Sequence, residues 1–556
     1  MTFRIGNCSG FYGDRFAAMR EMLTGGPLDV LTGDYLAELT MLILGRQRMK
    51  DPAGGYARTF LHQLEECLGL AMDRGVRIVT NAGGLNPAGL AAEITALADR
   101  LGLAVRVAHV DGDDLLPRAT ELGLDGALTA NAYLGAWGIA ECLRAGADVV
   151  VTGRVTDASL VVGPAAAHYG WARDDYDRLA GATVAGHVIE CGAQATGGNY
   201  AFFTELPDAT HIGFPIAEID ADGSTVITKH PDTGGAVTVE TVTAQLLYEI
   251  AGPRYLGPDV TSRFDTISLA PDGADRVRIS GVRGESPPDT LKVCLNTLAG
   301  FRNSATFVLC GLDIEAKAEL ARRQLANEIG AEGITWTLAR TDHSDADTEE
   351  TASALLHATI RTPDAKRAKG FSRTCVELAL ASYPGFTLTA PPADGTPVGV
   401  YRPEYVPVEQ VPHVAVLPNG ERVSIPPQSG DVTHQPNFAA PEPLSGPTRR
   451  VPLGTVLGAR SGDKGGDANL GVWARTDDAY RWLATELTVD RLRTLLPEAK
   501  ELDIERHPLP NLRAVNFVLH GLLGQGVAAS TRIDPQAKAL GEWLRSRIVD
   551  VPEVLL

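Results

Sequence analysis

The sequence lacks the patterns that mark membrane-spanning, secreted and nucleic-acid-binding proteins. No apolar run approaches the roughly 18 residues of a transmembrane helix. The opening MTFRIGNCSG has no basic start followed by an apolar stretch, as a signal peptide would. Basic residues are in deficit, with 50 Lys and Arg against 69 Asp and Glu and a formal charge of −19. Because no dense basic run is present to neutralise phosphates, we expect a cytoplasmic protein that binds neither membranes nor nucleic acids.

Short motifs of metal, nucleotide and hydrolase chemistry are also missing. The seven cysteines are scattered without a CxxC pair, which is typical of reduced thiols in a cytoplasm. The histidines form no HExxH, no GxSxG elbow is present, and the glycine-rich turns match neither GxGxxG nor a P-loop. We therefore predict no metal site and no cofactor.

The 556 residues suffice for three to four domains or subdomains of about 150 residues each. Within residues 1–198, short apolar runs alternate with amphipathic segments, a pattern typical of a mostly parallel sheet covered by helices. Residues 199–383 contain short alternating strands and later helices, which predicts an α+β part. The predicted helices of the first part are 35–48, 59–73, 87–101 and 137–145.

A proline-rich segment separates these parts from the end of the chain. Residues 384–452 hold 15 of the 34 prolines, so 384–440 reads as an extended connector that is neither a helix nor a central strand. We place it at the end of a main domain, 1–440. Residues 448–556 have the size of a separate small α/β domain. The predicted fold class is therefore α/β.

Candidate site residues follow the apolar strands, because ligands bind beyond the carboxyl ends of parallel strands. In VVVTGRVTDASL, a buried strand is followed by Arg154, Thr156 and Asp157. Arginine offers a planar fork to a carboxylate or phosphate, so we predict that Arg154 and Thr156 bind substrate. Asp157 would orient Arg154, act as a base or cap the next helix.

Two further carboxylates lie in LTGDYLAELT. Asp34 and Glu38 have the i, i+4 spacing that places both on one face of a helix starting here. Such a pair can work as acid and base or hold a cation. The alternative is that Asp34 caps the helix and Glu38 is solvated.

Glycine-rich turns follow two other strands. In TNAGGLNP, the amides of Asn81 and Asn86 and the backbone of Gly83 and Gly84 could bind a carbonyl or phosphate oxygen. In RIGNCSGFYGDR, Ser9 lies in a loop that could bind an anion. Each segment is equally compatible with a tight structural turn.

The segment VIECGAQATGGNY combines Glu190, an acid/base candidate, with Gln194, a substrate-binding candidate. Cys191 would be a nucleophile only if its pKa were lowered; otherwise it is a small buried hydrophobe.

The densest set of charges is in ARSGDKGGDANLGV. Its charged and amide side chains crowd between glycines, where they could clamp a phosphate or carboxylate, dock the small domain onto the main one, or belong to a solvated hairpin. They are Arg460, Asp463, Lys464, Asp467 and Asn469.

Taken together, the blocks NCSGFYGDR, LTGDYLAELTM, TNAGGLNP, VTGRVTDASL, ECGAQATGGNY and ARSGDKGGDANLGV resemble, in order, the acyclic terpene utilisation (AtuA) family. The resemblance covers nearly the whole chain and implies that the last hundred residues form an AtuA-like domain with a ferredoxin-like fold. It also implies a setting in bacterial degradation of acyclic terpenes such as citronellol and geraniol, through branched acyl-CoA thioesters.

Three functions are compatible with these observations. The first is a hydratase or lyase acting on a branched or carboxylated acyl-CoA, with Asp34, Glu38, Asp157 and Glu190 as catalytic candidates and a CoA thioester as substrate. The second is a non-catalytic adaptor that associates with acyl-CoA carboxylase subunits. The third is a thioester or ester hydrolase that uses Cys191. In each case we expect a homo-oligomer with a small-molecule ligand.

Overall fold

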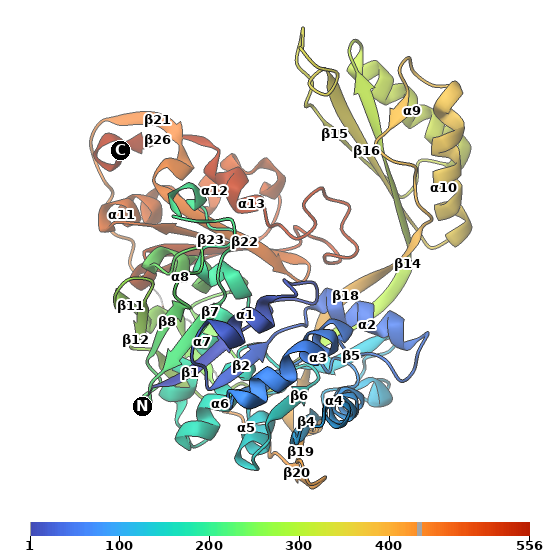
Figure 1. Cartoon of the computed structure of the whole chain (residues 1–556). Helices are drawn as coiled ribbons and strands as arrows, with labels where there is room; N and C mark the ends of the chain where they lie inside the picture. Colours follow the sequence, from blue (N-terminus) through green and yellow to red (C-terminus); the bar gives the residue numbers. More distant parts are fainter. Residues whose placement is uncertain (1, 431–435, 437) are drawn as a thin grey trace. The chain divides into compact units, whose positions relative to one another are not determined.

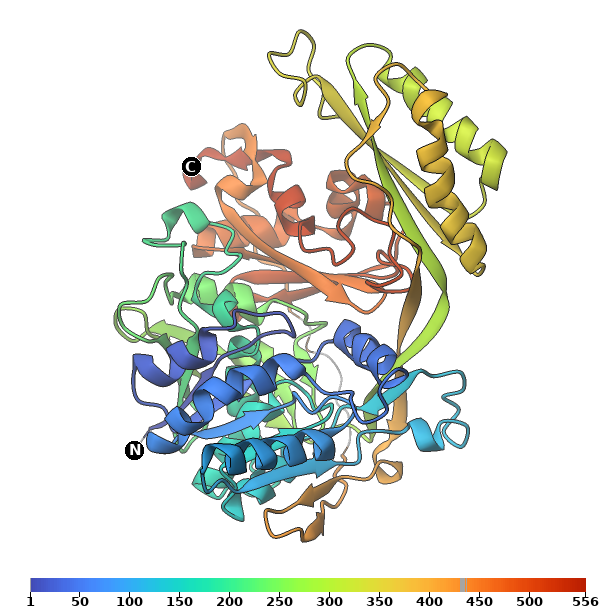
Figure 2. The same cartoon turned by 45° about the vertical axis from the view of Figure 1, so that its right-hand side comes forward.

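The computed structural model describes residues 2–430, 436 and 438–556, so residues 431–435 and 437 of the predicted connector lie outside the described residues. The chain forms two compact units (Figures 1 and 2). The first comprises residues 1–296, 401–527 and 536–556, and the second comprises residues 297–400 and 528–535. No helix of the described residues is long and apolar enough to cross a membrane.

The first unit is built on an eleven-stranded mixed sheet whose middle is parallel. The parallel strands, in spatial order, are β1 (Phe3–Asn7), β2 (Val30–Gly33), β3 (Arg77–Thr80), β6 (Val149–Thr152) and β4 (Val107–Asp111). Antiparallel strands extend this core on both sides, β7 (Pro215–Ile219), β8 (Thr225–Lys229), β12 (Val277–Ser280) and β11 (Ser268–Pro271) on one and β19 (Val414–Val416) and β20 (Arg422–Ser424) on the other. The expected α/β class with a mostly parallel N-terminal part is confirmed.

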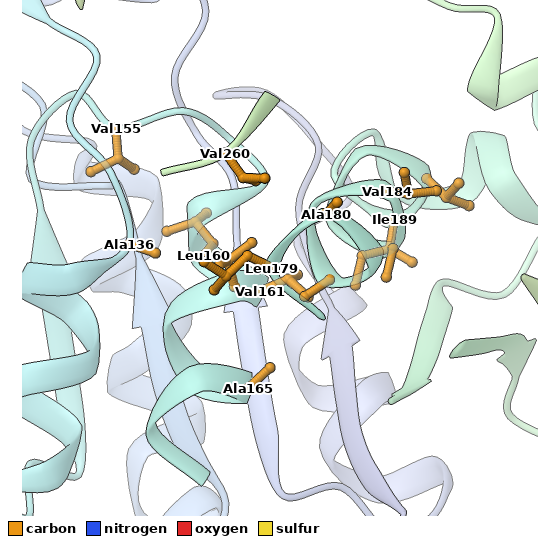
Figure 3. Close-up of a cluster of buried hydrophobic side chains, with 14 of the residues drawn as sticks. Ala136, Val155, Leu160, Val161, Ala165, Leu179, Ala180, Val184, Ile189 and Val260 are labelled. Carbon is orange, nitrogen blue, oxygen red and sulfur yellow. The ribbon is translucent and has the colours of Figure 1, made fainter. Parts of the chain in front are cut away.

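Successive residues of these short strands face opposite sides of the sheet, as the pleat requires. Ile78 and Val149 pack in one core, with α1 (Ala18–Gly25), α3 (Arg58–Asp73) and α4 (Pro87–Leu101). Val79 and Val150 pack in the other, with α5 (Trp137–Arg144), α6 (Ser159–Tyr169) and α7 (Tyr176–Ile189). Figure 3 shows side chains of α6 and α7, among them Leu160 and Leu179, in this second core. Helices on both faces explain why the strands read as continuous apolar runs.

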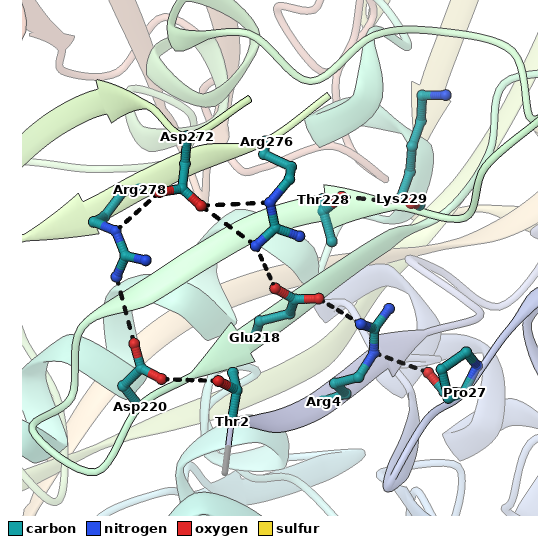
Figure 4. A network of polar contacts seen from close by, with 10 residues as sticks. All are labelled: Thr2, Arg4, Pro27, Glu218, Asp220, Thr228, Lys229, Asp272, Arg276 and Arg278. Carbon is teal, nitrogen blue, oxygen red and sulfur yellow. Dashed lines mark hydrogen bonds and ion pairs between the residues drawn. The ribbon is translucent and has the colours of Figure 1, made fainter. Parts of the chain in front are cut away.

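Ion pairs link the strands on the antiparallel side of the sheet, in addition to their apolar contacts (Figure 4). Glu218 of β7 accepts from Arg4 Nη1 at 2.5 Å and from Arg276 Nη2 at 2.7 Å. Arg278 of β12 lies 3.4 Å from Asp220. A polar network and an apolar core therefore both hold these strands together.

The C-terminal part of the first unit has its own sheet and its own hydrophobic core. The antiparallel order is β22 (Leu457–Lys464), β23 (Asp467–Ala474), β25 (Ala514–Leu519) and β24 (Ile504–Leu509). The core also takes side chains from α11 (Asp477–Glu486), α12 (Val489–Leu495) and α13 (Leu540–Arg545). A ribbon of β21 (Thr448–Pro452) and β26 (Ile548–Pro552) joins the two ends of this part.

The second unit has a separate antiparallel sheet, in which β14 (Thr290–Cys310) pairs with β16 (Ser353–Thr362) and β16 pairs with β15 (Ile334–Ala339). Helices α9 (Ile314–Ile329) and α10 (Ala365–Glu377) share its hydrophobic core. The predicted α+β part, 199–383, has other bounds, because residues 199–296 belong to the first unit and supply strands of its large sheet.

The proline-rich segment does more than connect. It supplies β18 (Thr396–Pro407), which pairs with β14, and β19, which lies between β4 and β20 in the large sheet. The expectation that it holds no strand inside a sheet is therefore wrong for β19. The strand is short, and its neighbouring prolines, Pro412 and Pro418, lie outside it, so no ladder donor is lost.

Candidate active site

The side-chain amide of Asn81 links the loops at the C-terminal ends of two neighbouring parallel strands, β2 and β3. Asn81, after β3, donates from Nδ2 to Oδ1 of Asp34, after β2, at 2.6 Å. Its Oδ1 accepts from the backbone N–H of Tyr35 at 2.8 Å. Asp34 Oδ1 also accepts from the N–H of Leu36 at 3.1 Å. Both side chains are buried, so the loop after β2 holds the carboxyl of Asp34 in one orientation.

This turn corrects one prediction. Helix α2 (Glu38–Arg48) begins at Glu38, and Asp34 lies before it, so the two carboxyls do not share a helix face. The alternative that Asp34 caps the helix is also wrong, because the residue at the cap is Ala37 and no side chain bonds there. The hydrogen bonds of Asp34 to Asn81 and Leu36 turn the chain before the helix starts.

Asp157 and Arg154 complete the site at the end of β6. Arg154 Nη1 donates to Leu36 O at 2.9 Å and to Asp157 Oδ1 at 3.1 Å, and its guanidinium lies 4.2 Å from the ring centre of Tyr133. The carboxyl groups of Asp34 and Asp157 interact electrostatically. Burial raises the pKa of Asp34, and the charge of Asp157 raises it further. Burial also raises the pKa of Asp157, although Arg154 opposes it. Ionisation of one of these buried carboxyl groups therefore disfavours ionisation of the other.

Glu190 directly follows the C-terminal end of α7, and Asn7 holds the backbone there. Asn7 Nδ2 donates to the backbone oxygens of Ile189 at 2.7 Å and Glu190 at 3.0 Å. Burial, and then the charge of Asp157, raise the pKa of Glu190 well above its ordinary value. His187 Nδ1 lies 3.2 Å from Glu190 Oε1, and burial lowers the pKa of His187 to about 4. Burial thus favours the neutral forms of both the Glu190 carboxyl group and the His187 imidazole.

Cys191 follows Glu190 but is not activated. Burial raises the pKa of its thiol well above the ordinary value, and Glu190 and Glu249 add to the effect. The reactive form of cysteine is the thiolate. The environment therefore favours the interpretation of Cys191 as a hydrophobe over that of a nucleophile.

Glu38 is the carboxyl group of the site that stays ionised. It accepts from Tyr133 Oη at 2.8 Å and lies 3.4 Å from Lys292 Nζ, on β14. Burial opposes its ionisation, but Lys292 and Arg154 outweigh burial and lower the pKa of Glu38 to about 2. A permanent carboxylate therefore faces two permanent cations.

The hairpin of β22 and β23 brings the glycine-rich block to the same place. It lies against the chain after α8 (Val239–Leu246), where a Cβ at Gly462 would come within 2.4 Å of the Tyr248 ring. The guanidinium of Arg460 lies 4.6 Å from the centre of that ring, and its Nη1 donates to Asn199 O at 3.1 Å. Lys464 Nζ donates to the backbone oxygen of Glu249 at 3.2 Å.

Asp463 and Glu249 add two more acids with raised pKa. Burial, followed by the charge of Glu249, raises the pKa of Asp463 to about 8. Burial, followed by the charges of Glu38 and Asp157, raises that of Glu249 to about 7. Lys538 Nζ lies 3.7 Å from a carboxyl oxygen of each. We call the whole set the acid–base cluster; it comprises Asp34, Glu38, Asp157, Glu190, Glu249 and Asp463, with Arg154, Lys292, Arg460, Lys464 and Lys538.

Several predicted substrate-binding residues make local contacts outside the acid–base cluster. These contacts lie in turns, at a helix start and between strands. Ser9 Oγ donates to Phe11 O at 3.0 Å, Asn86 Oδ1 accepts from Gly89 N at the start of α4, Thr156 Oγ1 lies 2.6 Å from Ser159 Oγ, Asp467 pairs with His520 at 2.9 Å, and Asn469 bonds to Asn516.

The two glycines of TNAGGLNP are required by packing. A Cβ on Gly83 would lie 2.4 Å from Thr152 O, and Gly84 has a φ of +54° with Gly55 O 2.7 Å from where its Cβ would be. Gln194 is half-buried, and its Oε1 has no hydrogen-bond partner among the described residues.

Sequence reasoning missed Glu249, Lys292 and Lys538. Each is a single charged residue outside the glycine-rich motifs. Glu249 in LLYEIAG and Lys292 in TLKVCL interrupt apolar runs, and that interruption was the one available signal. No group of three or more His, Cys, Asp or Glu side chains in the described part of the chain is arranged to hold a metal ion.

The fold and the cluster together define an α/β protein with a buried set of carboxyl groups held at different protonation states beside cations. Residues 3–417 match the family described as "Acyclic terpene utilisation family protein AtuA", and residues 451–550 match the "AtuA ferredoxin-like domain". The chain therefore belongs to the acyclic terpene utilisation AtuA family, and the resemblance seen in its sequence blocks is confirmed. No curated protein and no solved structure matches the chain.

Proposed function

We propose that this protein is an acid–base enzyme of acyclic terpene or branched-chain acyl-CoA catabolism, a hydratase or lyase that acts on a carboxylated acyl-CoA. The observation that carries the proposal is the buried carboxyl pair of Asp34 and Asp157, in which the charge of Asp157 raises the pKa of Asp34 and Arg154 Nη1 lies 3.1 Å from Asp157 Oδ1. Hydration and carbon–carbon cleavage both need one group that gives a proton and one that takes it. A carboxyl pair in which one member is protonated while the other is ionised would supply both.

The remaining groups suit the same chemistry. Glu190 is a second protonated acid, and one of its buried oxygens has no hydrogen-bond partner among the described residues, so it is free to donate to a ligand. Arg154 and Arg460 are buried cations that can bind a carboxylate through a planar fork. With most carboxyl groups protonated, the cluster favours an anionic substrate. No redox step is required, so the proposal includes no cofactor.

The test is turnover of carboxylated branched acyl-CoA thioesters of the 3-hydroxyglutaryl and glutaconyl types by the purified full chain, followed by mass spectrometry. We expect hydration, dehydration or cleavage of at least one thioester. Asp157→Asn should lower kcat by about 10²–10⁴-fold, the usual contribution of a positioned acid or base. Asp99→Asn, an exposed aspartate on α4, serves as the matched control and should keep full activity.

The outcome decides between functions. Turnover that survives Asp157→Asn overturns the assignment of the pair. No turnover of any thioester, together with stable co-purification of acyl-CoA carboxylase subunits, would replace the enzyme by an adaptor.

A further inference from the structure

Lys464 differs from the other amines of the acid–base cluster in its partners. Lys292 pairs with Glu38, and Lys538 lies 3.7 Å from both Asp463 and Glu249. Among the described residues, no carboxylate oxygen comes within 4.0 Å of Lys464 Nζ, whose hydrogen bond goes to the backbone oxygen of Glu249. A backbone carbonyl accepts more strongly from an ammonium than from a neutral amine, but it accepts from both, so this contact is compatible with either form of Lys464.

We propose that Lys464 is a nucleophile that forms an imine with the ketone of an oxo-carboxylate substrate. The inference goes beyond the proposed function, whose thioesters carry no ketone, and rests on it only in that the same cluster binds the substrate's carboxylate. Lys464 is half-buried at the end of β22, so part of its surface stays accessible. The next residue, Gly465, has a φ of +68°, which fixes the turn that carries the amine.

The surroundings of the amine favour its neutral form. Burial, and then the ammonium of Lys292 on β14, lower the pKa of Lys464 to about 8. Three carboxyl groups face it and act against that change: Glu249 after α8, Glu38 on α2 and Asp467 on β23. At pH 7 about a tenth of Lys464 is therefore the free amine, against well under a hundredth for an ordinary lysine. Desolvation beside a second cation is a known way to activate such a lysine.

The neighbouring acids complete the chemistry. The nitrogen of Lys464 attacks the carbonyl carbon, a proton moves from nitrogen to oxygen, and a carbinolamine forms. The protonated carboxyl group of Glu249, which interacts electrostatically with Lys464, then gives its proton to the hydroxyl, which leaves as water as the carbon–oxygen bond breaks. The resulting cationic imine accepts the electron pair of the adjacent carbon–hydrogen bond as that bond breaks, and the proton passes to the carboxylate of Glu38, which gives the enamine. Arg460, buried 4.6 Å from the ring of Tyr248, is placed on the same strand to hold the carboxylate.

The test is reductive trapping of the full chain with acetoacetate and borohydride at pH 8, with acetone as the neutral comparison. Intact-mass measurement and peptide mapping locate the adduct. We expect one borohydride-dependent adduct with acetoacetate, on the peptide that contains Lys464, in yield about tenfold above that on any exposed lysine, because the free-amine fraction is so much larger. Acetone should give less.

Variants separate the role of Lys464 from general reactivity. Lys464→Arg keeps the charge and should lose the adduct, whereas Lys500→Arg, an exposed lysine, should keep it. Peptide mapping of the unaltered chain decides the matter even if Lys464→Arg does not fold. An adduct spread over exposed lysines, or none, overturns the proposal.

The two proposals fail separately. Asp157→Asn should abolish turnover of thioesters yet leave trapping by acetoacetate intact. Turnover of thioesters without any adduct on Lys464 would refute the imine and leave the acid–base proposal standing. An adduct on Lys464 without turnover of any thioester would support the imine and refute the acid–base proposal.

Discussion

Asn469 on β23 and Asn516 on β25 lie diagonally across this pair of strands and hydrogen-bond through their side-chain amides. Asn469 Oδ1 also accepts from the backbone N–H of Glu249 at 2.8 Å, and Asn516 Nδ2 donates to Ile250 O at 3.1 Å. Both amides are completely buried. Glu249 has a φ of +57°, a left-handed conformation that is costly for a residue with a side chain. The amide pair thus holds Glu249 in a strained backbone conformation. It thereby also holds the backbone oxygen of Glu249, to which Lys464 donates.

Replacing Asn516 by Ala should destabilise the protein by about 1–3 kcal/mol, because backbone carbonyls and the amide of Asn469 lose buried partners. The measurement is urea denaturation followed by circular dichroism. Asn327→Ala, at an exposed position of α9, is the control and should change stability by no more than about 0.5 kcal/mol. Equal stability of the two variants would show that the amide pair is not holding the loop.

Gly153→Ala should disturb the acid–base cluster at the end of β6. A Cβ at this position would lie 2.4 and 2.5 Å from the two carboxyl oxygens of Asp113, which accepts from the backbone N–H of Arg154 at 2.8 Å. Overpacking of this kind costs about 1–3 kcal/mol, and here it also displaces Arg154. We expect lower stability in urea and weaker substrate binding. Gly370→Ala, inside α10 with nothing near its Cβ, should instead stabilise by about 0.5–1 kcal/mol.

Titration of the Asp113 carboxyl group should make the free energy of unfolding fall as pH rises. Burial raises the pKa of its carboxyl to about 7, from an ordinary value near 4 in the unfolded chain. A carboxyl whose pKa is higher in the folded state contributes stability that is fully present below about pH 4 and is lost as pH rises to about 7.

Asp113→Asn removes that titration and keeps the shape. Its free energy of unfolding should therefore fall by a few kcal/mol less than that of the unaltered chain between pH 4.5 and 7.5, by the linkage relation. Urea denaturation across this range is the measurement, and Asp99→Asn should follow the unaltered chain. Parallel curves for Asp113→Asn and the unaltered chain would mean that Asp113 is ionised when folded.

Cys191 should resist alkylation. Because burial and the neighbouring Glu190 keep its thiol protonated, iodoacetamide at pH 8 should modify it more slowly than the half-buried Cys310 of the second unit. Peptide mass spectrometry at timed intervals gives the order of labelling. Cys191→Ala should also retain thioester turnover, and a loss of turnover would reinstate the hydrolase hypothesis.

The site residues that sequence reasoning found share a physical signal. Asp34, Asn81 and Arg154 each follow a buried apolar strand, and the carboxyl ends of parallel strands meet at one edge of a sheet. Helices α3 and α4 lie within a residue of their predicted bounds, because apolar residues recur there at three- and four-residue steps.

The residues that it missed have no such local signal. Lys292 and Lys538 reach the cluster only through strand pairing and packing over long sequence distances, which local patterns do not record. Asp34 and Glu38 were assigned to one helix face because their spacing fits a helix. The hydrogen bonds of Asp34 to Asn81 and Leu36 overrode that spacing. Asp467 and Asn469 belong to the same charged block as Lys464, and only the strand register separates their roles.

The acid–base cluster draws on residues from Asp34 to Lys538, and this order has a consequence for synthesis of the protein. On the ribosome, the early carboxyl groups emerge long before Arg460, Lys464 and Lys538 do. The nascent chain can complete its parallel strands while three of the five cations of the cluster are still untranslated. The cluster is therefore complete only with the C-terminal part of the chain, and a chain released before β22 would have the central strands without Lys464.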